Sequence, residues 1–207
     1  MSTYPEFNDL GDEMLALVKS REFWRTAPWA IEAILDRELM TPVVVDPCAG
    51  DRRMGDAARR VGYDDIIESD IEPWVPGYPV HDFLHEKKEW RSKVHFAQMR
   101  DNTVFMNPPF SLAVDFVERC FELGARKVIC FQRWAWYETT TRKDFWDKHP
   151  PNRIYLCGSR ATCWMASIGP KERSKKGGST PTAHGWYIWE RGQRGGPVIE
   201  RIYKHND

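Results

Sequence analysis

The chain has 207 residues, of which 42% are hydrophobic and 29% are charged, a composition that is typical of globular proteins and excludes the disordered class. No apolar run approaches the roughly 20 residues that cross a bilayer, and the polar, acidic N-terminus has no secretory signal pattern. Thirty basic residues balance thirty acidic ones, which excludes a strongly basic molecule that attracts nucleic acid over its whole surface.

We therefore expect one domain spanning residues 1–207, in the cytoplasm and without a membrane partner. A nucleic acid partner would have to bind a local basic patch. Whether the protein is a monomer or a homodimer stays open. The cysteines are scattered, without C-x-x-C pairs or clusters with histidine, so we expect reduced thiols and no metal site.

Helical and strand patterns alternate from the start of the chain. Residues 12–19 and 28–40 have apolar side chains at helical spacing, and the β-branched run at residues 43–45 predicts a strand covered on both faces. Residues 56–61 predict the next helix, and residues 66–67 begin a second short strand.

The middle of the chain continues this alternation. Residues 80–83 are a possible third strand, and residues 103–106 predict a fourth. Ser111 is the expected N-cap of a helix that ends at Gly124, and residues 128–131 predict a fifth strand.

The last third of the chain has a different pattern. Residues 153–157, 186–190 and 198–203 predict strands with antiparallel pairing at one edge of the sheet, while residues 169–185 are rich in Gly, Ser and Lys and predict a mobile loop. The whole pattern predicts a single α/β domain with a mostly parallel sheet and helices on both faces.

Unusual residues follow three of the predicted parallel strands. The first strand runs into the DPCAG sequence at residues 46–50, the second ends near Asp70, and the fourth runs into the NPPF sequence at residues 107–110. Ligands of open parallel sheets bind beyond the carboxyl ends of the strands. We therefore expect these three segments to meet at one binding site.

From about Phe23 to Trp189 the chain resembles the class I S-adenosylmethionine-dependent methyltransferases. Within them it is similar to the DNA adenine enzymes, whose signature is D/N-P-P-Y/F/W. NPPF between a strand and a helix is the most specific element of this resemblance, and DPCAG after the first strand is the second. The resemblance implies a Rossmann-like sheet of seven strands, S-adenosylmethionine as cofactor, DNA as partner, and a solitary enzyme like those of phages.

The resemblance also implies a set of cofactor-binding residues, which are Thr26, Asp46, Pro47, Cys48, Gly50, Asp70, Asp82 and Phe83. Gly50 has no side chain to keep the backbone away from a ligand, and Asp70 offers two acceptor oxygens to the ribose hydroxyls. Three alternatives remain open. Residues 46–50 could form only a structural turn, Asp70 could be an ordinary turn residue, and Asp82 could cap a helix.

Two departures from the family pattern concern this site. An alanine separates Thr26 from Pro28, where the family reads T-P, and residues 51–53 read D-R-R after Gly50, where relatives often have a second glycine. Asp51 is a further candidate contact for the cofactor. We expect an unusual loop shape or cofactor affinity.

The NPPF motif supplies the expected catalytic residues, Asn107, Pro108, Pro109 and Phe110. An adenine amino nitrogen is a poor nucleophile because its lone pair is delocalised into the ring. If the Asn107 side-chain oxygen and the Pro108 carbonyl accept its two protons, the lone pair is aimed at the methyl group. Phe110 would stack on a base extruded from the helix, and the prolines would stiffen the loop.

Substrate contacts are expected from two further segments. Arg133, Trp134 and Trp136 follow the fifth strand and could stack on nucleic acid, or the tryptophans could belong to the core. A basic run in the predicted loop could contact phosphates, or it could be a solvated surface loop. The residues of this run are Lys171, Arg173, Lys175 and Lys176.

The leading hypothesis is methyl transfer to adenine N6 in DNA, with no separate target-recognition domain. The same amino chemistry on RNA adenine or on a protein glutamine amide is one alternative. A non-catalytic protein that binds the cofactor or nucleic acid is another, suggested by the altered glycine loop.

Overall fold

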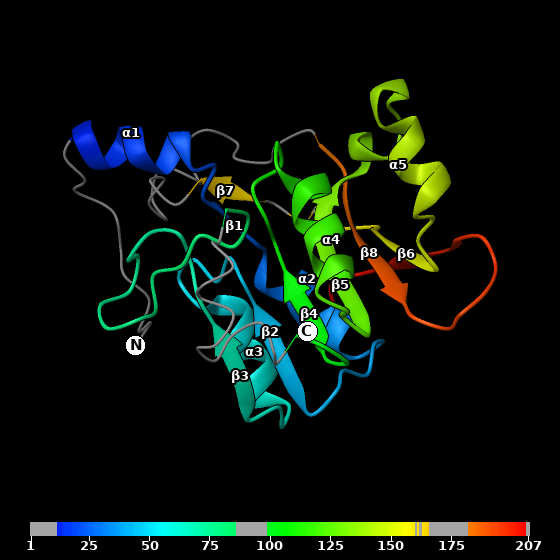
Figure 1. The fold of residues 1–207 in the computed structure, drawn as a ribbon, viewed down its shortest axis with the longest axis horizontal. Helices are drawn as coiled ribbons and strands as arrows, with labels where there is room; N and C mark the ends of the chain where they lie inside the picture. The colour runs from blue at the N-terminus through cyan, green and yellow to red at the C-terminus, as the bar shows by residue number, and fades with distance from the viewer. Residues whose placement is uncertain (1–11, 86–98, 160, 162, 166–181, 206–207) are drawn as a thin grey trace.

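The protein is described from a computed structural model, in which residues 12–85, 99–159, 161, 163–165 and 182–205 are placed (Figure 1). Its centre is a seven-stranded sheet. The strands are β2 Val43–Asp46, β3 Asp65–Glu68, β4 Thr103–Met106, β5 Lys127–Arg133, β6 Arg153–Cys157, β8 His184–Glu190 and β9 Val198–Ile202. Their order across the sheet is β3-β2-β4-β5-β8-β6-β9.

The sheet is mostly parallel. Strands β3, β2, β4 and β5 pair in parallel, β8 is antiparallel to both of its neighbours, and β9 is parallel to β6. Strand β8 alone therefore runs against the others, in the half of the sheet where antiparallel pairing was expected. The predicted fold class is confirmed.

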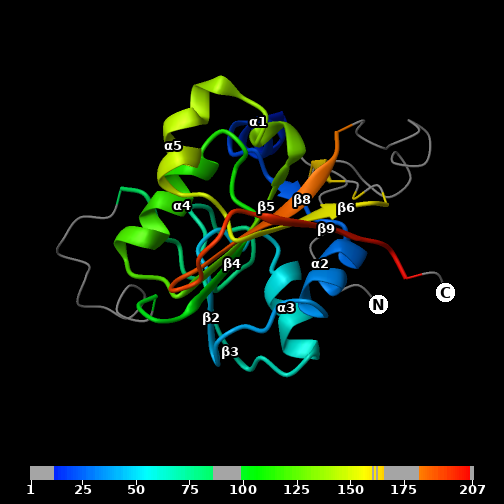
Figure 2. The same cartoon turned by 90° about the vertical axis from the view of Figure 1, so that its right-hand side faces the viewer.

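Helices cover both faces of the sheet (Figure 2). They are α2 Pro28–Leu35 and α3 Arg53–Arg60 on one face, with α4 Ala113–Glu122 and α5 Lys143–Lys148 on the other. Successive side chains of a strand point to opposite faces, and accordingly Val44 packs in the core under α2 and α3 while Val45 packs in the core under α4. The β-branched run of β2 is thus buried on both faces, as predicted.

A smaller unit lies beside the carboxyl ends of the parallel strands. Helix α1, Asp12–Ser20, leads into β1, Trp24–Arg25, which pairs antiparallel with β7, Trp164–Met165. Short 3-10 turns at Trp134–Trp136 and Thr140–Arg142 connect β5 to α5. None of the helices in the described ranges has the length and apolar character needed to cross a membrane.

Several predicted boundaries were wrong. The expected third strand at residues 80–83 is only a bridge between Asp70 and Val80, because the Asp82 side chain accepts the following backbone N–H groups. The helix expected at 28–40 ends at Leu35, where the chain turns so that Glu38 reaches the sheet.

Two loop predictions also need correction. Ser111 is not the N-cap of α4; that position belongs to Leu112, and the Ser111 backbone N–H donates to the Glu22 carboxylate instead. The loop predicted at residues 169–185 extends too far, because its last two residues, His184 and Gly185, pair in β8 with β5. Residues 169–181 of that loop lie outside the described residues.

Candidate functional site

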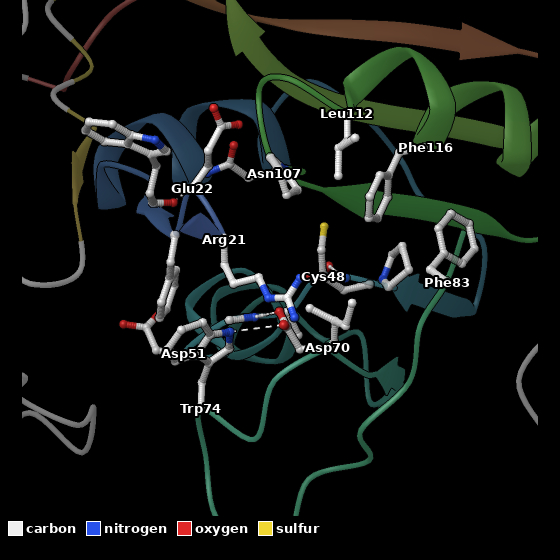
Figure 3. A pocket seen from close by; sticks show the side chains of 18 of the residues that line it. Arg21, Glu22, Cys48, Asp51, Asp70, Trp74, Phe83, Asn107, Leu112 and Phe116 are labelled. Atoms are coloured by element: carbon white, nitrogen blue, oxygen red, sulfur yellow. Dashed lines mark hydrogen bonds between the residues drawn. The ribbon is translucent and has the colours of Figure 1, made fainter. Parts of the chain in front are cut away.

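A cavity of about 260 Å³ lies at the carboxyl ends of β2, β3 and β4, beside the segment that joins α1 to β1 (Figure 3). All the residues predicted to bind the cofactor line it, namely Thr26, Asp46, Pro47, Cys48, Gly50, Asp70, Asp82 and Phe83. Asn107 and Pro109 of the NPPF motif line it as well, whereas Pro108 and Phe110 do not. Leu112 and Phe116 of α4 supply an apolar wall.

The turn after β2 brings backbone close to the cavity. The Asp46 carboxylate accepts the Cys48 backbone N–H at 3.1 Å, which fixes the turn. Gly50 has φ +54°, and a Cβ at this position would lie 2.6 Å from Cε2 of Phe23. Only glycine fits this close approach without strain. Burial and the nearby Glu68 carboxylate raise the pKa of Asp46 well above its ordinary value.

The Asp70 carboxylate lies at the edge of the cavity and accepts hydrogen bonds from backbone and side-chain donors. It accepts the Gly50 N–H at 2.9 Å, the Trp74 indole N–H at 3.0 Å and the Glu72 N–H at 3.1 Å. Burial raises the pKa of Asp70 to about 6, although these hydrogen bonds oppose the shift. The Ile71 backbone N–H is a fourth donor to Asp70, and a carboxylate has about four acceptor sites, so a ligand hydroxyl would have to share these oxygens or displace a donor. Arg21 also lines the cavity (Figure 3), and its guanidinium lies 2.7 Å from the Glu72 carboxylate.

Asp82 and Phe83 lie on the wall that α4 completes. The Asp82 carboxylate accepts the N–H groups of Leu84 at 3.2 Å and His85 at 3.1 Å, so it caps a local turn. Phe83 is 3% exposed and packs against Phe116, with ring centroids 5.1 Å apart. Both residues line the cavity.

In the Asn107 side-chain amide, the nitrogen makes hydrogen bonds and the oxygen makes none among the described residues. Its Nδ2 donates to the Trp24 carbonyl at 2.9 Å and to Thr26 Oγ1 at 2.8 Å. Its Oδ1 is buried and accepts no hydrogen bond from the part of the chain that the structure describes. The next carbonyl, that of Pro108, accepts Gln132 Nε2 at 3.4 Å, which is longer than an ordinary hydrogen bond.

Phe110 is covered in this structure. The Arg133 guanidinium carbon lies 4.2 Å from the Phe110 ring centroid, and the Trp24 ring lies 6.0 Å away at an interplanar angle of 17°. Phe110 is 8% exposed. A flat ligand that stacks on this ring would therefore have to displace Arg133 or insert beside it.

The predicted substrate contacts that the structure describes, Arg133, Trp134 and Trp136, do not line the cavity. Trp134 is half-buried against Tyr137, and Trp136 is 4% exposed within an aromatic cluster that includes Phe145 and Tyr187. Trp136 therefore has the core role that was the alternative interpretation. The basic run, Lys171, Arg173, Lys175 and Lys176, lies outside the described residues.

The loop after Gly50 is built around arginines. Asp51 is 4% exposed, and its Oδ2 lies 2.6 Å from Arg25 Nε and 2.7 Å from Arg53 Nε. Its carboxylate is thus engaged within the chain, although Asp51 lines the cavity. Arg52, which lies in the segment after Gly50, adopts φ +70° and lies over the Tyr78 ring at 4.3 Å.

Sequence reasoning missed the segment from Arg21 to Arg25, which lines the cavity beside the NPPF loop. The Glu22 carboxylate accepts the Ser111 backbone N–H at 2.9 Å, and the Trp24 carbonyl accepts from Asn107. The FWR sequence before Thr26 shows aromatic and basic character but gives no sign of these contacts. In the described ranges, no group of three or more metal-binding side chains is close enough to hold a metal ion.

No protein-family model and no curated protein sequence matches this chain. A proposed RNA methyltransferase from Pyrococcus horikoshii superposes with a TM-score of 0.54 at 14% identity, over 91% of this chain and 92% of that protein. A predicted O-methyltransferase from Agrobacterium tumefaciens gives 0.54 at 13% identity, over 84% and 85% of the two chains. A type I restriction-modification methyltransferase subunit from Streptococcus thermophilus gives 0.54 at 11% identity, over 84% of this chain and 45% of that one. These likenesses show a shared Rossmann-like methyltransferase fold.

Proposed function

We propose that this protein transfers a methyl group from S-adenosylmethionine to an amino nitrogen, with adenine N6 in DNA as the leading substrate. The observation that carries the proposal is the buried Asn107 Oδ1, an acceptor without a partner among the described residues and on a side chain that lines the cavity. A buried acceptor left unpaired costs about 1–3 kcal/mol, so it favours a ligand that brings an N–H donor.

The cavity residues fit the cofactor. S-adenosylmethionine supplies an electrophilic methyl group on its sulfonium. Gly50 admits the Phe23 ring against the turn that lines the cavity, and Asp70 offers carboxylate oxygens that the ribose hydroxyls would share with its present donors. In this proposal Asp46 faces the methionine amine, and the Phe83 ring packs on the adenine while Asp82 accepts its amino group. The shared methyltransferase fold supports the same assignment.

The state of Asn107 favours an amino acceptor over a hydroxyl one. Both N–H groups of its amide are directed to Trp24 and Thr26, so the free end can only accept. A hydroxyl substrate would also need a base to remove its proton, and a neutral amide is not one. An amino group can take up the methyl group first and lose one proton to solvent afterwards, so during transfer it needs orientation, with one proton directed to Asn107 Oδ1 and the other to the Pro108 carbonyl, whose contact with Gln132 is weak.

The choice of DNA rests on the NPPF motif and on groups suited to a flipped base. Phe110 is covered by Arg133 in this structure and would offer a ring face once Arg133 moves its charge to a phosphate. We propose that loops of a single domain serve for recognition in place of a separate one. RNA adenine or a protein glutamine amide would use the same amino chemistry, and the non-catalytic alternative would bind the cofactor without turnover.

Substitution of Asn107 tests the proposal. Asn107→Ala should lower methyl transfer by at least about 100-fold, the effect of removing one preorganised hydrogen-bonding group from an active site. The affinity for S-adenosylmethionine, measured by calorimetry, should change little because Asn107 orients the acceptor. Gln193→Ala removes an exposed amide in the turn after β8 and serves as the matched control. A near wild-type rate in Asn107→Ala, with the same thermal stability, would refute the role of Asn107.

A further inference from the structure

The orientation of the Asn107 amide is set by a segment that lies more than 80 residues earlier in the chain. The Trp24 carbonyl can only accept, so the atom that faces it at 2.9 Å must be the amide nitrogen. Thr26 Oγ1 accepts from the same nitrogen at 2.8 Å, and the two contacts occupy both of its N–H groups. The amide oxygen is thereby left without a chain partner among the described residues.

Rotation of this amide by half a turn is disfavoured. The rotated form would place Asn107 Oδ1 against the Trp24 carbonyl, which has no proton to donate, so the hydrogen bond to Trp24 would be lost, whereas the Thr26 hydroxyl could still donate to Oδ1. Thr26 is 3% exposed, so water does not compete for its hydroxyl, and a buried hydrogen bond of this kind is stronger than an exposed one. The Trp24 carbonyl therefore selects the orientation that frees Oδ1, and Thr26 adds a second hydrogen bond that holds the amide in place.

Thr26 is itself held from both sides. On one side, Arg25 forms a buried ion pair with Asp51 at 2.6 Å and pairs with Trp164 across β1 and β7. On the other side, Ala27 is the N-cap of α2, whose first turn contains a proline with a fixed φ. The hydroxyl is thus presented from a fixed backbone rather than from a free loop.

We propose that Thr26 is a positioning residue for Asn107, which holds the amide so that its oxygen receives the acceptor amino group. This assignment rests on the proposed function and changes the role expected for Thr26, which the family resemblance places among the cofactor contacts. The Trp24 carbonyl belongs to the backbone and cannot be removed by substitution. Thr26 is the part of this arrangement that a variant can test.

Two variants at one position separate the hydroxyl from the shape of the side chain. Thr26→Val keeps the branched shape and removes the acceptor, whereas Thr26→Ser keeps the hydroxyl. At saturating S-adenosylmethionine we expect kcat of Thr26→Val to fall about ten-fold, the effect of one hydrogen bond, with KM for the acceptor changed less. Thr26→Ser should recover kcat to within about two-fold of wild type. The dissociation constant for the cofactor should stay close to wild type in both variants.

A second readout does not depend on turnover. With asparagine labelled selectively with ¹⁵N, the side-chain NH₂ resonance of Asn107 is identified by its loss in Asn107→Ala. We expect Thr26→Val to shift this resonance and Thr26→Ser to keep it near the wild-type position, because only valine removes the acceptor. Thermal unfolding of each variant checks that the fold is retained.

The outcomes are distinguishable. An unchanged kcat and an unchanged Asn107 resonance in Thr26→Val would overturn the proposal. If Thr26→Val binds the cofactor more weakly while kcat and the Asn107 resonance are unchanged, Thr26 is a cofactor contact, and this result would also overturn the proposal. If the wild-type protein methylates no acceptor, the proposed function fails. The shift of the Asn107 side-chain resonance in Thr26→Val then tests by itself whether Thr26 is hydrogen-bonded to Asn107.

Discussion

Two buried carboxyl groups stand at the carboxyl ends of neighbouring parallel strands. Burial raises the pKa of Asp70 to about 6, and burial together with the Glu68 carboxylate raises the pKa of Asp46 well above its ordinary value. For each group the folded protein therefore holds the proton more tightly than the unfolded chain. Its contribution to stability is present below the ordinary pKa of an aspartate and is lost as the pH rises through the folded pKa. Burying an ionised carboxylate costs free energy, and carboxyl groups that line a cavity despite this desolvation cost are typical of binding sites.

We predict that S-adenosylmethionine binds more weakly as the pH falls through about 6, because a protonated Asp70 loses acceptor capacity. Calorimetric titrations between about pH 5 and pH 8 measure this dependence. Asp70→Asn should bind weakly throughout and lack the step near pH 6, while Asp147→Asn, exposed on α5, should keep the wild-type profile. A step that survives in Asp70→Asn would assign the titration to another group, such as Asp46.

The convergence of three strand-end segments at one cavity could be predicted from the sequence, and the way Asn107 is held could not. Strand ends of a parallel sheet meet at one edge, so DPCAG, Asp70 and NPPF had to converge once the strands were recognised. The contact of Asn107 with Thr26 depends on the placement of β1, a strand of two residues whose pairing with β7 has no sequence pattern. The packing of Trp136 in the core was likewise undecided until its neighbours were known.

At the scale of elements, Glu38 joins the end of the α2 segment to the sheet. Its carboxylate lies 3.0 Å from Lys127 Nζ on β5, 2.8 Å from the Arg153 guanidinium on β6 and 3.0 Å from the Tyr155 hydroxyl. Burial raises the pKa of Glu38, but the hydrogen bonds from Arg153 and Lys127 outweigh it, so the pKa lies below its ordinary value. This cluster lies at the amino ends of β5 and β6, away from the cavity.

We predict that Glu38→Ala lowers the free energy of unfolding by more than about 1 kcal/mol, the effect of an exposed pair, but by less than about 3–5 kcal/mol, the effect of an isolated buried charge, because Lys127 and Arg153 lose one shared carboxylate and keep Glu190. Urea denaturation near pH 7 measures the change. Glu200→Ala breaks an exposed pair with Arg37 and should cost no more than about 1 kcal/mol. The Glu38 contribution is present above the ordinary pKa of a glutamate and is lost as the pH falls through the lowered folded value. Equal effects of the two variants would contradict this account of the cluster.

Elements with strong local patterns were predicted, and those set by tertiary contacts were not. The β-branched run of β2 and the apolar run of β4 identified their strands because burial on both faces requires continuous apolar residues. The early end of α2 follows from Glu38, whose partners lie about 90 and 115 residues further along the chain. Helical periodicity alone gave no reason to stop there.

At the scale of the whole molecule, the net charge bears on how DNA could be bound, and the sheet architecture determines which segments meet at the cavity. Equal numbers of acidic and basic residues give no general attraction to a polyanion, so DNA binding would have to come from local groups near the cavity, of which Arg133 is one. The sheet brings the NPPF loop and the DPCAG turn to one cavity, which is what transfer between two bound molecules requires.

The central claim is methyl transfer to an amino nitrogen, and the most direct measurement is transfer of a labelled methyl group from S-adenosylmethionine to unmethylated DNA, followed by mass spectrometry of the nucleosides. RNA and a protein extract are tested in parallel. We predict label in N6-methyladenine from DNA with the wild-type protein and none with Asn107→Ala. Label in RNA adenine or in glutamine would contradict the choice of DNA, and label in no acceptor, despite measurable cofactor binding, would contradict the claim itself.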